Sequence, residues 1–188
     1  TASATKFLRG DNSWAVPSSA GHTIIDMAAA TTDTGSVTNG TFLMTTTVDS
    51  NFTAGSIKFQ YKVLPTSVSN ITVGIYTYVE QGIDSTTANV LLGKGSVGTN
   101  PTTKRVSISL TAETGQNLNL TSGTNYVVAW RQFGGNSSSV VLAGSSGSLS
   151  DVNLAATIDG NPTLPAQLVN SGELSFTATT LRPALTIY

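Results

Sequence analysis

The chain has 188 residues, no cysteine, only 10% charged residues and a formal net charge of −1 at pH 7. This length can bury a core, and the lack of cysteine excludes thiol catalysis and thiolate metal sites. Nucleic-acid binding needs clustered basic residues, and Lys104-Arg105 is the only adjacent basic pair; no apolar run approaches the about 20 residues of a membrane-spanning helix. We therefore expect neither a nucleic-acid partner nor membrane insertion.

Residues 1–20 are predicted to form an irregular connector arm, and residues 21–188 a single β-sandwich domain. In the arm, the run Phe7-Leu8-Arg9-Gly10-Asp11-Asn12-Ser13-Trp14 resembles the F-L-R-G-D-G-x-W segment that recurs in bacteriophage tail-fibre and related virion-fibre proteins. That segment commonly joins a shaft to a distal module. Asn12 stands where the familiar form has glycine, and asparagine also tolerates a left-handed turn.

The resemblance implies a homotrimer, exposed on a phage particle, that contacts other virion proteins through its arm. A short arm cannot bury Phe7, Leu8 and Trp14 alone, whereas three arms around an axis or a neighbouring domain could. The candidate inter-subunit residues are therefore Phe7, Leu8, Arg9, Asp11 and Trp14. The alternative is that Phe7 and Trp14 dock on their own domain.

Alternating apolar and polar residues predict two strands at 56–63 and 71–79, with β-branched and aromatic side chains on one face. We expect these two strands to pair with each other and to nucleate the sandwich. Further strands are expected at 42–48, 90–92 and 105–110, the second being interrupted by Gly93 and Gly95.

Residues 118–132 contain Leu120, Gly123, Thr124 and Tyr126 in a spacing that resembles the tyrosine corner of fibronectin-like β-sandwiches. There the tyrosine hydroxyl bonds back across the corner loop. The strand that follows is apolar on both faces, which indicates a central position in a sheet. Arg131, near the end of this strand, is expected at a polar rim.

The remaining sequence predicts a strand at 139–143 in a hairpin with the preceding strand, a long loop at 144–161, and two closing strands at 174–178 and 184–188. The C-terminus should thus be tied into a sheet. About 9–10 strands with no long helical pattern predict an all-β fold, an antiparallel two-sheet β-sandwich or jelly roll.

Candidate ligand-binding residues are Tyr76, Tyr78 and Arg131. The two tyrosines lie on the face opposite Ile71, Val73 and Ile75, where exposed rings could stack on a sugar. Contact with a second subunit, or cover for that side of the sheet, explains them equally well.

We expect no enzyme activity, metal or cofactor. His22 is the only histidine, and we expect it at the surface or in a loop. Gly144-Ser145-Ser146-Gly147 is one residue shorter than a G-x-S-x-G nucleophile turn. The Asp/Asn-rich turns at 49–51 and 159–161 lack the spacing of a calcium loop.

The favoured function is the distal part of a phage fibre that attaches the virion to a host surface glycan. One alternative keeps the fold and places it on the capsid as a head fibre or decoration protein. Another is a monomeric carbohydrate-binding module of a secreted bacterial protein, with the arm as a mere linker.

Overall fold

The computed structural model describes residues 7–8, 14–15, 21–23, 32–36, 41–79, 89–98, 100–134, 141–146, 153–158, 163–168, 174–178 and 181–188. Within these ranges every regular element is a β-strand, and every strand pair is antiparallel. The described part of the chain contains no helix long and apolar enough to cross a membrane. The predicted all-β, antiparallel fold is confirmed.

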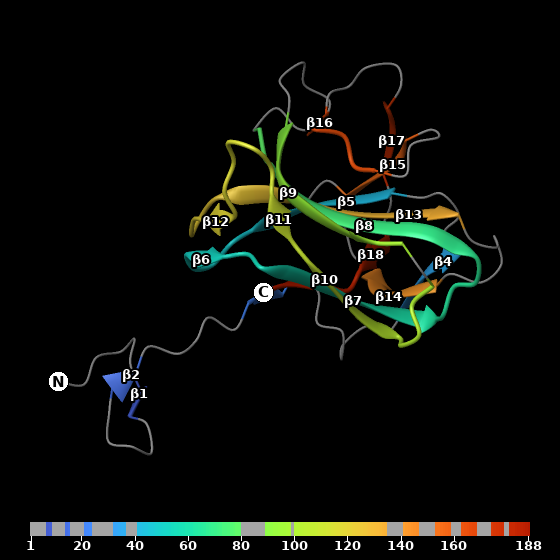
Figure 1. The fold of residues 1–188 in the computed structure, drawn as a ribbon, viewed down its shortest axis with the longest axis horizontal. Coiled ribbons are helices and arrows are strands. Elements are labelled where there is room, and N and C mark those ends of the chain that lie inside the picture. Colours follow the sequence, from blue (N-terminus) through green and yellow to red (C-terminus); the bar gives the residue numbers. More distant parts are fainter. Residues whose placement is uncertain are drawn as a thin grey trace.

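The strands form two large sheets that face each other as a sandwich (Figure 1). The seven-stranded sheet contains β3 (His22–Thr23), β4 (Thr32–Ser36), β7 (Ser56–Val63), β10 (Arg105–Ser109), β14 (Val141–Ser146), β18 (Leu181–Pro183) and β19 (Leu185–Ile187). The eight-stranded sheet contains β5 (Thr41–Thr47), β8 (Val68–Thr77), β9 (Asn89–Val97), β11 (Thr111–Ala112), β13 (Asn125–Gly134), β15 (Asn153–Ile158), β16 (Gln167–Leu168) and β17 (Leu174–Ala178).

Two small sheets complete the described strands. One is the pair β6 (Phe52–Thr53) and β12 (Asn119–Leu120). The other is a hairpin of β1 (Phe7–Leu8) and β2 (Trp14–Ala15), which stands apart from the sandwich in Figure 1. Its register places Phe7 opposite Ala15 and Leu8 opposite Trp14, so the predicted irregular arm contains a short ladder. Arg9 and Asp11 lie outside the described residues.

The strands predicted at 56–63 and 71–79 exist, but the pairing expected between them is wrong. β7 pairs with β10, β14 and β19, whereas β8 pairs with β9 and β13 in the other sheet. The chain therefore crosses from one layer to the other through residues 64–67. The apolar faces of β7 and β8 meet across the core, which satisfies the alternating pattern as well as direct pairing would.

The core between the sheets is built around Trp130 of β13. Its ring centroid lies 5.9 Å from that of Phe42, 5.9 Å from that of Phe59 and 6.4 Å from that of Tyr61. Phe59 and Tyr61 belong to β7, so these contacts join the two layers. All four rings are buried, and tilted or edge-to-face aromatic pairs each add about 0.5–1.5 kcal/mol beyond area burial.

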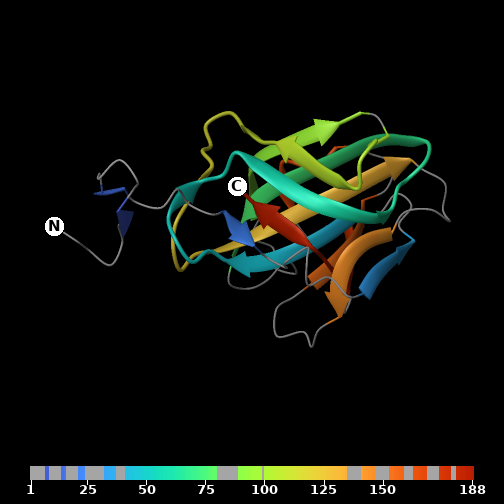
Figure 2. The same ribbon diagram turned by 90° about the horizontal axis from the view of Figure 1, so that it is seen from below.

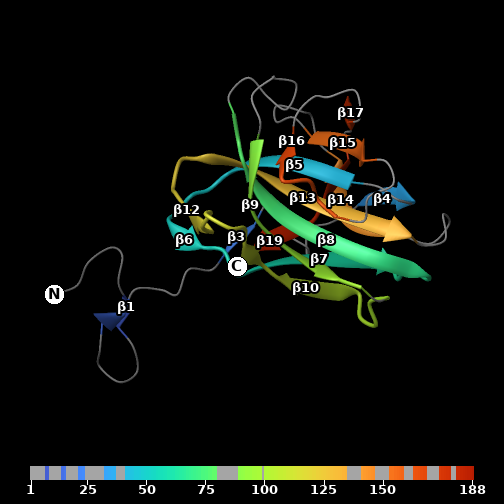
Figure 3. The same cartoon turned by 45° about the horizontal axis from the view of Figure 1, so that its top comes forward.

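The middle of the eight-stranded sheet is buried on both faces. β13 lies between β5 and β8, and its residues point alternately into the core and to the opposite face, where Val127 and Ala129 are fully buried. Leu164 and Leu168 of the segment 163–168 cover this outer face. Figure 3 shows β16, which ends that segment, on the side of the layer that faces away from β7. The central position predicted for the 126–130 strand is confirmed.

The tyrosine corner is also confirmed. The Tyr126 hydroxyl accepts a hydrogen bond from the backbone N–H of Thr121 at 3.0 Å, and Gly123 within the corner has a φ of 76°. This bond ties the corner loop to the start of β13.

Other expectations need correction. β14 does not form a hairpin with β13 but pairs with β4, β7 and β18, and β15 occupies part of the loop expected at 144–161. β9 runs through Gly93 and Gly95 as one strand, with a register shift against β8 between Leu91 and Gly93. The described strands outnumber the expected 9–10, because several are two-residue ladders that carry no alternating pattern.

The C-terminus is part of a sheet, as predicted. β19 pairs with β7 and β3, and Figure 2 shows this last strand, in red, beside β7. The backbone of Tyr188 exchanges hydrogen bonds with that of Ser56 at 2.8 and 2.9 Å.

We predict that Trp130→Ala lowers the free energy of unfolding by about 3–5 kcal/mol, because it leaves a cavity where both sheets meet. Urea unfolding followed by circular dichroism measures the change. Val63→Ala is the matched control, since Val63 is 48% exposed and its truncation should change stability by no more than about 0.5 kcal/mol. Equal losses in both variants would contradict the central role of Trp130.

Candidate functional site

The structure buries Tyr76, so this ring is not the exposed sugar platform that the sequence suggested. Its side chain is 0% exposed and packs with Leu91, Val127 and Leu164 on the outer face of the eight-stranded sheet. Its hydroxyl donates a hydrogen bond of 2.8 Å to the carbonyl oxygen of Pro165. Of the readings left open, cover for that side of the sheet is the one that this geometry fits.

Arg131 is not at a rim either. It is 1% exposed and lies in β13 between Thr41 of β5 and Thr72 of β8. Its Nη1 atom donates to the Thr41 hydroxyl at 2.8 Å. We expected a rim because Arg131 is near the end of its strand. It is buried because β5 and β8 pair with β13 at this position, one on each side.

The segment 163–168 is the element that sequence reasoning missed. It crosses the outer face, where a Cβ on Gly74 would lie 2.7 Å from Leu164, so the absence of a side chain at Gly74 makes room for the leucine. The Leu91 N–H also donates to the Ala166 carbonyl oxygen at 2.9 Å. The sequence feature that could have indicated a buried segment here is the pair of leucines, Leu164 and Leu168, close to Pro165.

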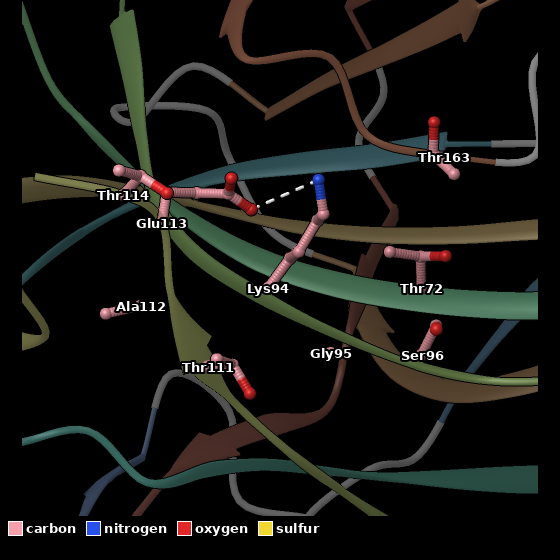
Figure 4. A pocket seen from close by; sticks show the side chains of 9 residues that line it. All are labelled: Thr72, Lys94, Gly95, Ser96, Thr111, Ala112, Glu113, Thr114 and Thr163. Carbon is pink, nitrogen blue, oxygen red and sulfur yellow. Dashed lines mark ion pairs between the residues drawn. The ribbon is translucent and has the colours of Figure 1, made fainter. Parts of the chain in front are cut away.

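A hydroxyl-lined pocket opens beside this segment (Figure 4). Its volume is about 410 Å³, and it is lined by Thr72, Lys94, Gly95, Ser96, Thr111, Ala112, Glu113, Thr114 and Thr163. These residues come from β8, β9, β11, the turn after β11 and the covering segment. The pocket therefore forms only when strands from different parts of the chain meet.

An ion pair crosses the hydroxyl-lined pocket. Lys94 Nζ lies 3.1 Å from Glu113 Oε1, and the two side chains are 38% and 34% exposed. A pair this exposed contributes at most about 1 kcal/mol to stability. Both charged groups thus remain accessible to a ligand that offers hydroxyls.

Gly95, which lines the same pocket, lies where β9 and β10 approach each other closely. A Cβ on Gly95 would overlap the backbone carbonyl oxygen of Ser109, so only glycine lets β9 run this close to the end of β10. The chain then passes from β10 in one sheet to β11 in the other. The glycine that seemed to interrupt a strand is needed for this passage.

Tyr78 lines a second cavity, which we call the Tyr78 pocket. Its volume is about 300 Å³, and it is lined by Thr77, Tyr78, Leu92, Asn117, Asn119, Thr124, Asn125 and Tyr126. It lies where β8 ends and β13 begins, next to the tyrosine corner. Of the three predicted ligand-binding residues, Tyr78 is the one that the structure places at a cavity, and the asparagines around it were missed.

His22 is not a surface or loop residue, in contrast to the expectation. It lies in β3 with its side chain 9% exposed, and its Nε2 is 2.6 Å from the Thr46 hydroxyl. Its Nδ1 is 3.7 Å from a carboxylate oxygen of Asp49. Neither His22 nor Thr46 lines either pocket described here, so we interpret these contacts as a tie between β3 and β5.

Within the described ranges, no three His, Cys, Asp or Glu side chains come together in a group that could hold a metal ion. The predicted turn at 159–161 lies outside those ranges.

Comparison with models of protein families finds no match to this sequence. Comparison with curated proteins finds no similar protein. The site must therefore be interpreted from its own geometry.

Burial of two tyrosines predicts a loss of stability at high pH. Burial raises the pKa of Tyr76 above its ordinary value of 10.0, with a further rise from Glu113 and a smaller opposing effect of Arg131; burial likewise raises the pKa of Tyr61. Above pH 10 these tyrosines lose their protons in the unfolded chain but keep them in the folded protein. Each should then lower the free energy of unfolding by about 1.4 kcal/mol per pH unit.

Urea unfolding at pH 8, 9, 10 and 11 measures this effect. Stability is expected to be independent of these two groups below pH 10 and to fall steeply above it. Tyr76→Phe should remove about half of the contribution of the pair to that slope. A slope unchanged in both Tyr76→Phe and Tyr61→Phe would contradict the prediction.

Proposed function

We propose that this chain is the distal part of a bacteriophage virion fibre, a non-enzymatic β-sandwich that attaches the particle to a glycan on a bacterial surface. The observation that carries the proposal is the segment from Phe7 to Trp14, which resembles the connector of fibre proteins. Its two apolar ends are brought together as β1 and β2. Because the comparisons with known proteins found no match, they neither support nor contradict this resemblance.

The surface of the sandwich supports the attachment part of the proposal. The hydroxyl-lined pocket presents threonine and serine hydroxyls together with Lys94 and Glu113, and the Tyr78 pocket presents an aromatic ring with amides. Such groups hydrogen-bond and stack on sugars. Both pockets are lined by paired strands of the sandwich together with the turns between them, and the backbone pairing preorganises the strand residues.

A carbohydrate-binding module of a secreted bacterial protein remains the second candidate, because the same pockets would serve it equally well. It differs from the fibre in assembly: the module would be a monomer, and the β1–β2 hairpin would have no partner. A capsid decoration protein would share the fold and differ in its position on the particle.

We predict that the purified chain has the mass of a trimer, measured by light scattering behind a sizing column. The double substitution Phe7→Ala and Trp14→Ala should shift it toward the monomer, because it removes the two large apolar rings of the hairpin. Tyr188→Ala is the matched control, since Tyr188 is an exposed aromatic on the sandwich. A monomeric wild-type chain would contradict the fibre assembly and favour the carbohydrate-binding module.

We also predict that the fluorescently labelled chain adsorbs to cells of its bacterial host, identified by screening a panel of strains. Periodate, which cleaves vicinal diols of sugars, should abolish adsorption, whereas protease treatment of the cells should not. Adsorption that survives periodate and is lost with protease would replace the glycan by a protein receptor.

A further inference from the structure

We infer that the Tyr78 pocket is the subsite that recognises an uncharged pyranose ring. The inference deepens the proposed function and rests on it only for the origin of the sugar, a host glycan. The side chains that line the cavity supply an aromatic ring and amide groups, and hydrogen bonds within the protein orient the amides.

Tyr78 supplies a supported aromatic surface. Its side chain is half-buried and packs against the outer cluster that contains Tyr76 and Leu91, while it also lines the cavity. A ring held in this way loses little conformational freedom when a ligand stacks on it. The apolar C–H face of a pyranose is a partner of matching size and shape.

Three asparagines supply oriented hydrogen-bond donors. Asn125 Oδ1 accepts from the Thr47 hydroxyl at 2.5 Å, and Asn119 Oδ1 accepts from the Thr53 hydroxyl at 2.7 Å. Asn117 Oδ1 accepts from the backbone N–H of Asn119 at 3.0 Å. Because each carbonyl oxygen is engaged within the protein, each side chain offers its Nδ2 amide to a ligand.

Secondary structure fixes these donors. Asn125 is directly opposite Thr47 in the β13–β5 ladder, and Asn119 is directly opposite Thr53 in the β12–β6 ladder. The tyrosine corner, closed by the bond from Thr121 to Tyr126, lies between the two ladders. Their spacing is therefore set by backbone pairing, which is the condition for a preformed site.

The lining favours a neutral ligand with acceptor oxygens. Every residue that lines the Tyr78 pocket is uncharged, in contrast to the hydroxyl-lined pocket with its lysine and glutamate. Ring, hydroxyl and N-acetyl oxygens of a neutral sugar can accept from the asparagine amides. The volume of about 300 Å³ is at the lower end of small-molecule sites, which suits one ring.

The test uses the full chain labelled with ¹⁵N and four probes: the methyl glycosides of glucose, mannose, N-acetylglucosamine and glucuronic acid. Two-dimensional NMR follows the side-chain amide signals of Asn117, Asn119 and Asn125 during titration, and saturation transfer follows the sugar. We expect at least one neutral glycoside to shift these signals with a Kd of roughly millimolar, as is typical of a single small ring. Affinity should be unchanged between 0.05 and 0.5 M salt.

The variants test separately the stacking of the sugar on Tyr78, hydrogen-bond donation by Asn125, and the location of the binding site. Tyr78→Ala and Asn125→Asp should each raise the Kd at least tenfold, and Asn125→Asp keeps the shape of the side chain in case Tyr78→Ala perturbs the fold. Tyr188→Ala, which changes an exposed tyrosine elsewhere, is the control that should leave the Kd unchanged. Lys94→Ala tests instead whether the glycoside binds in the hydroxyl-lined pocket. Circular dichroism and urea unfolding verify that each variant is folded.

Three results would overturn the inference: no shift with any neutral glycoside, preferential binding of the glucuronide, or loss of binding in Lys94→Ala but not in Tyr78→Ala. Failure of the proposed function is a separate outcome. A chain that is monomeric and does not adsorb to cells but binds a neutral glycoside would support the sugar subsite and contradict the proposed fibre function. A trimer that adsorbs to cells but shows none of these amide shifts with the neutral glycosides would support the proposed fibre function and contradict the sugar subsite.

Discussion

The contact of Trp130 with the aromatic rings of β7 holds the two sheets together, and the rest of the structure depends on it. Trp130 lies on the central strand of one sheet, while Phe59 and Tyr61 lie on a strand of the other. Once these rings meet, the residues of β13 that alternate with Trp130 must point to the opposite face. That face buries Val127, Ala129 and Arg131, so it requires a cover of its own.

The cover determines where a ligand can bind. Leu164 and Leu168 close the centre of the outer face, and the bond from Tyr76 to Pro165 fixes the segment that carries them. Within the described part of the chain, both pockets lie at the margins of this face. One is beside the covering segment, and the other is at the start of β13.

Sequence patterns predicted what each strand buries but not which strand it meets. The period of two identified the inward residues of β7 and β8 correctly, yet alternation is the same whether two strands pair side by side or face each other across a core. The tyrosine corner was predictable because its bond is local, five residues from donor to acceptor. Tyr76 was misplaced because segment 163–168, far along the chain, covers it, and Arg131 because strands distant in sequence pair on both sides of it. Asn119 and Asn125 of the Tyr78 pocket were missed for a related reason, since their orientation comes from threonines more than 60 residues away.

For the fibre proposed above, the position of β3 has a mechanical consequence. β3 follows the hairpin in sequence, so tension applied through a tethered hairpin reaches the sandwich at His22–Thr23. There the load is borne by the antiparallel ladder to β19, which is itself paired with β7, and by the contact of His22 with Thr46 of β5. Force from a moving particle would thus be divided between both sheets at the point of entry. That path runs beside the Tyr78 pocket, because Thr46 lies opposite Tyr126, which lines the pocket. The hydroxyl-lined pocket stands off the path, since none of its lining residues belongs to β3, β5 or β19.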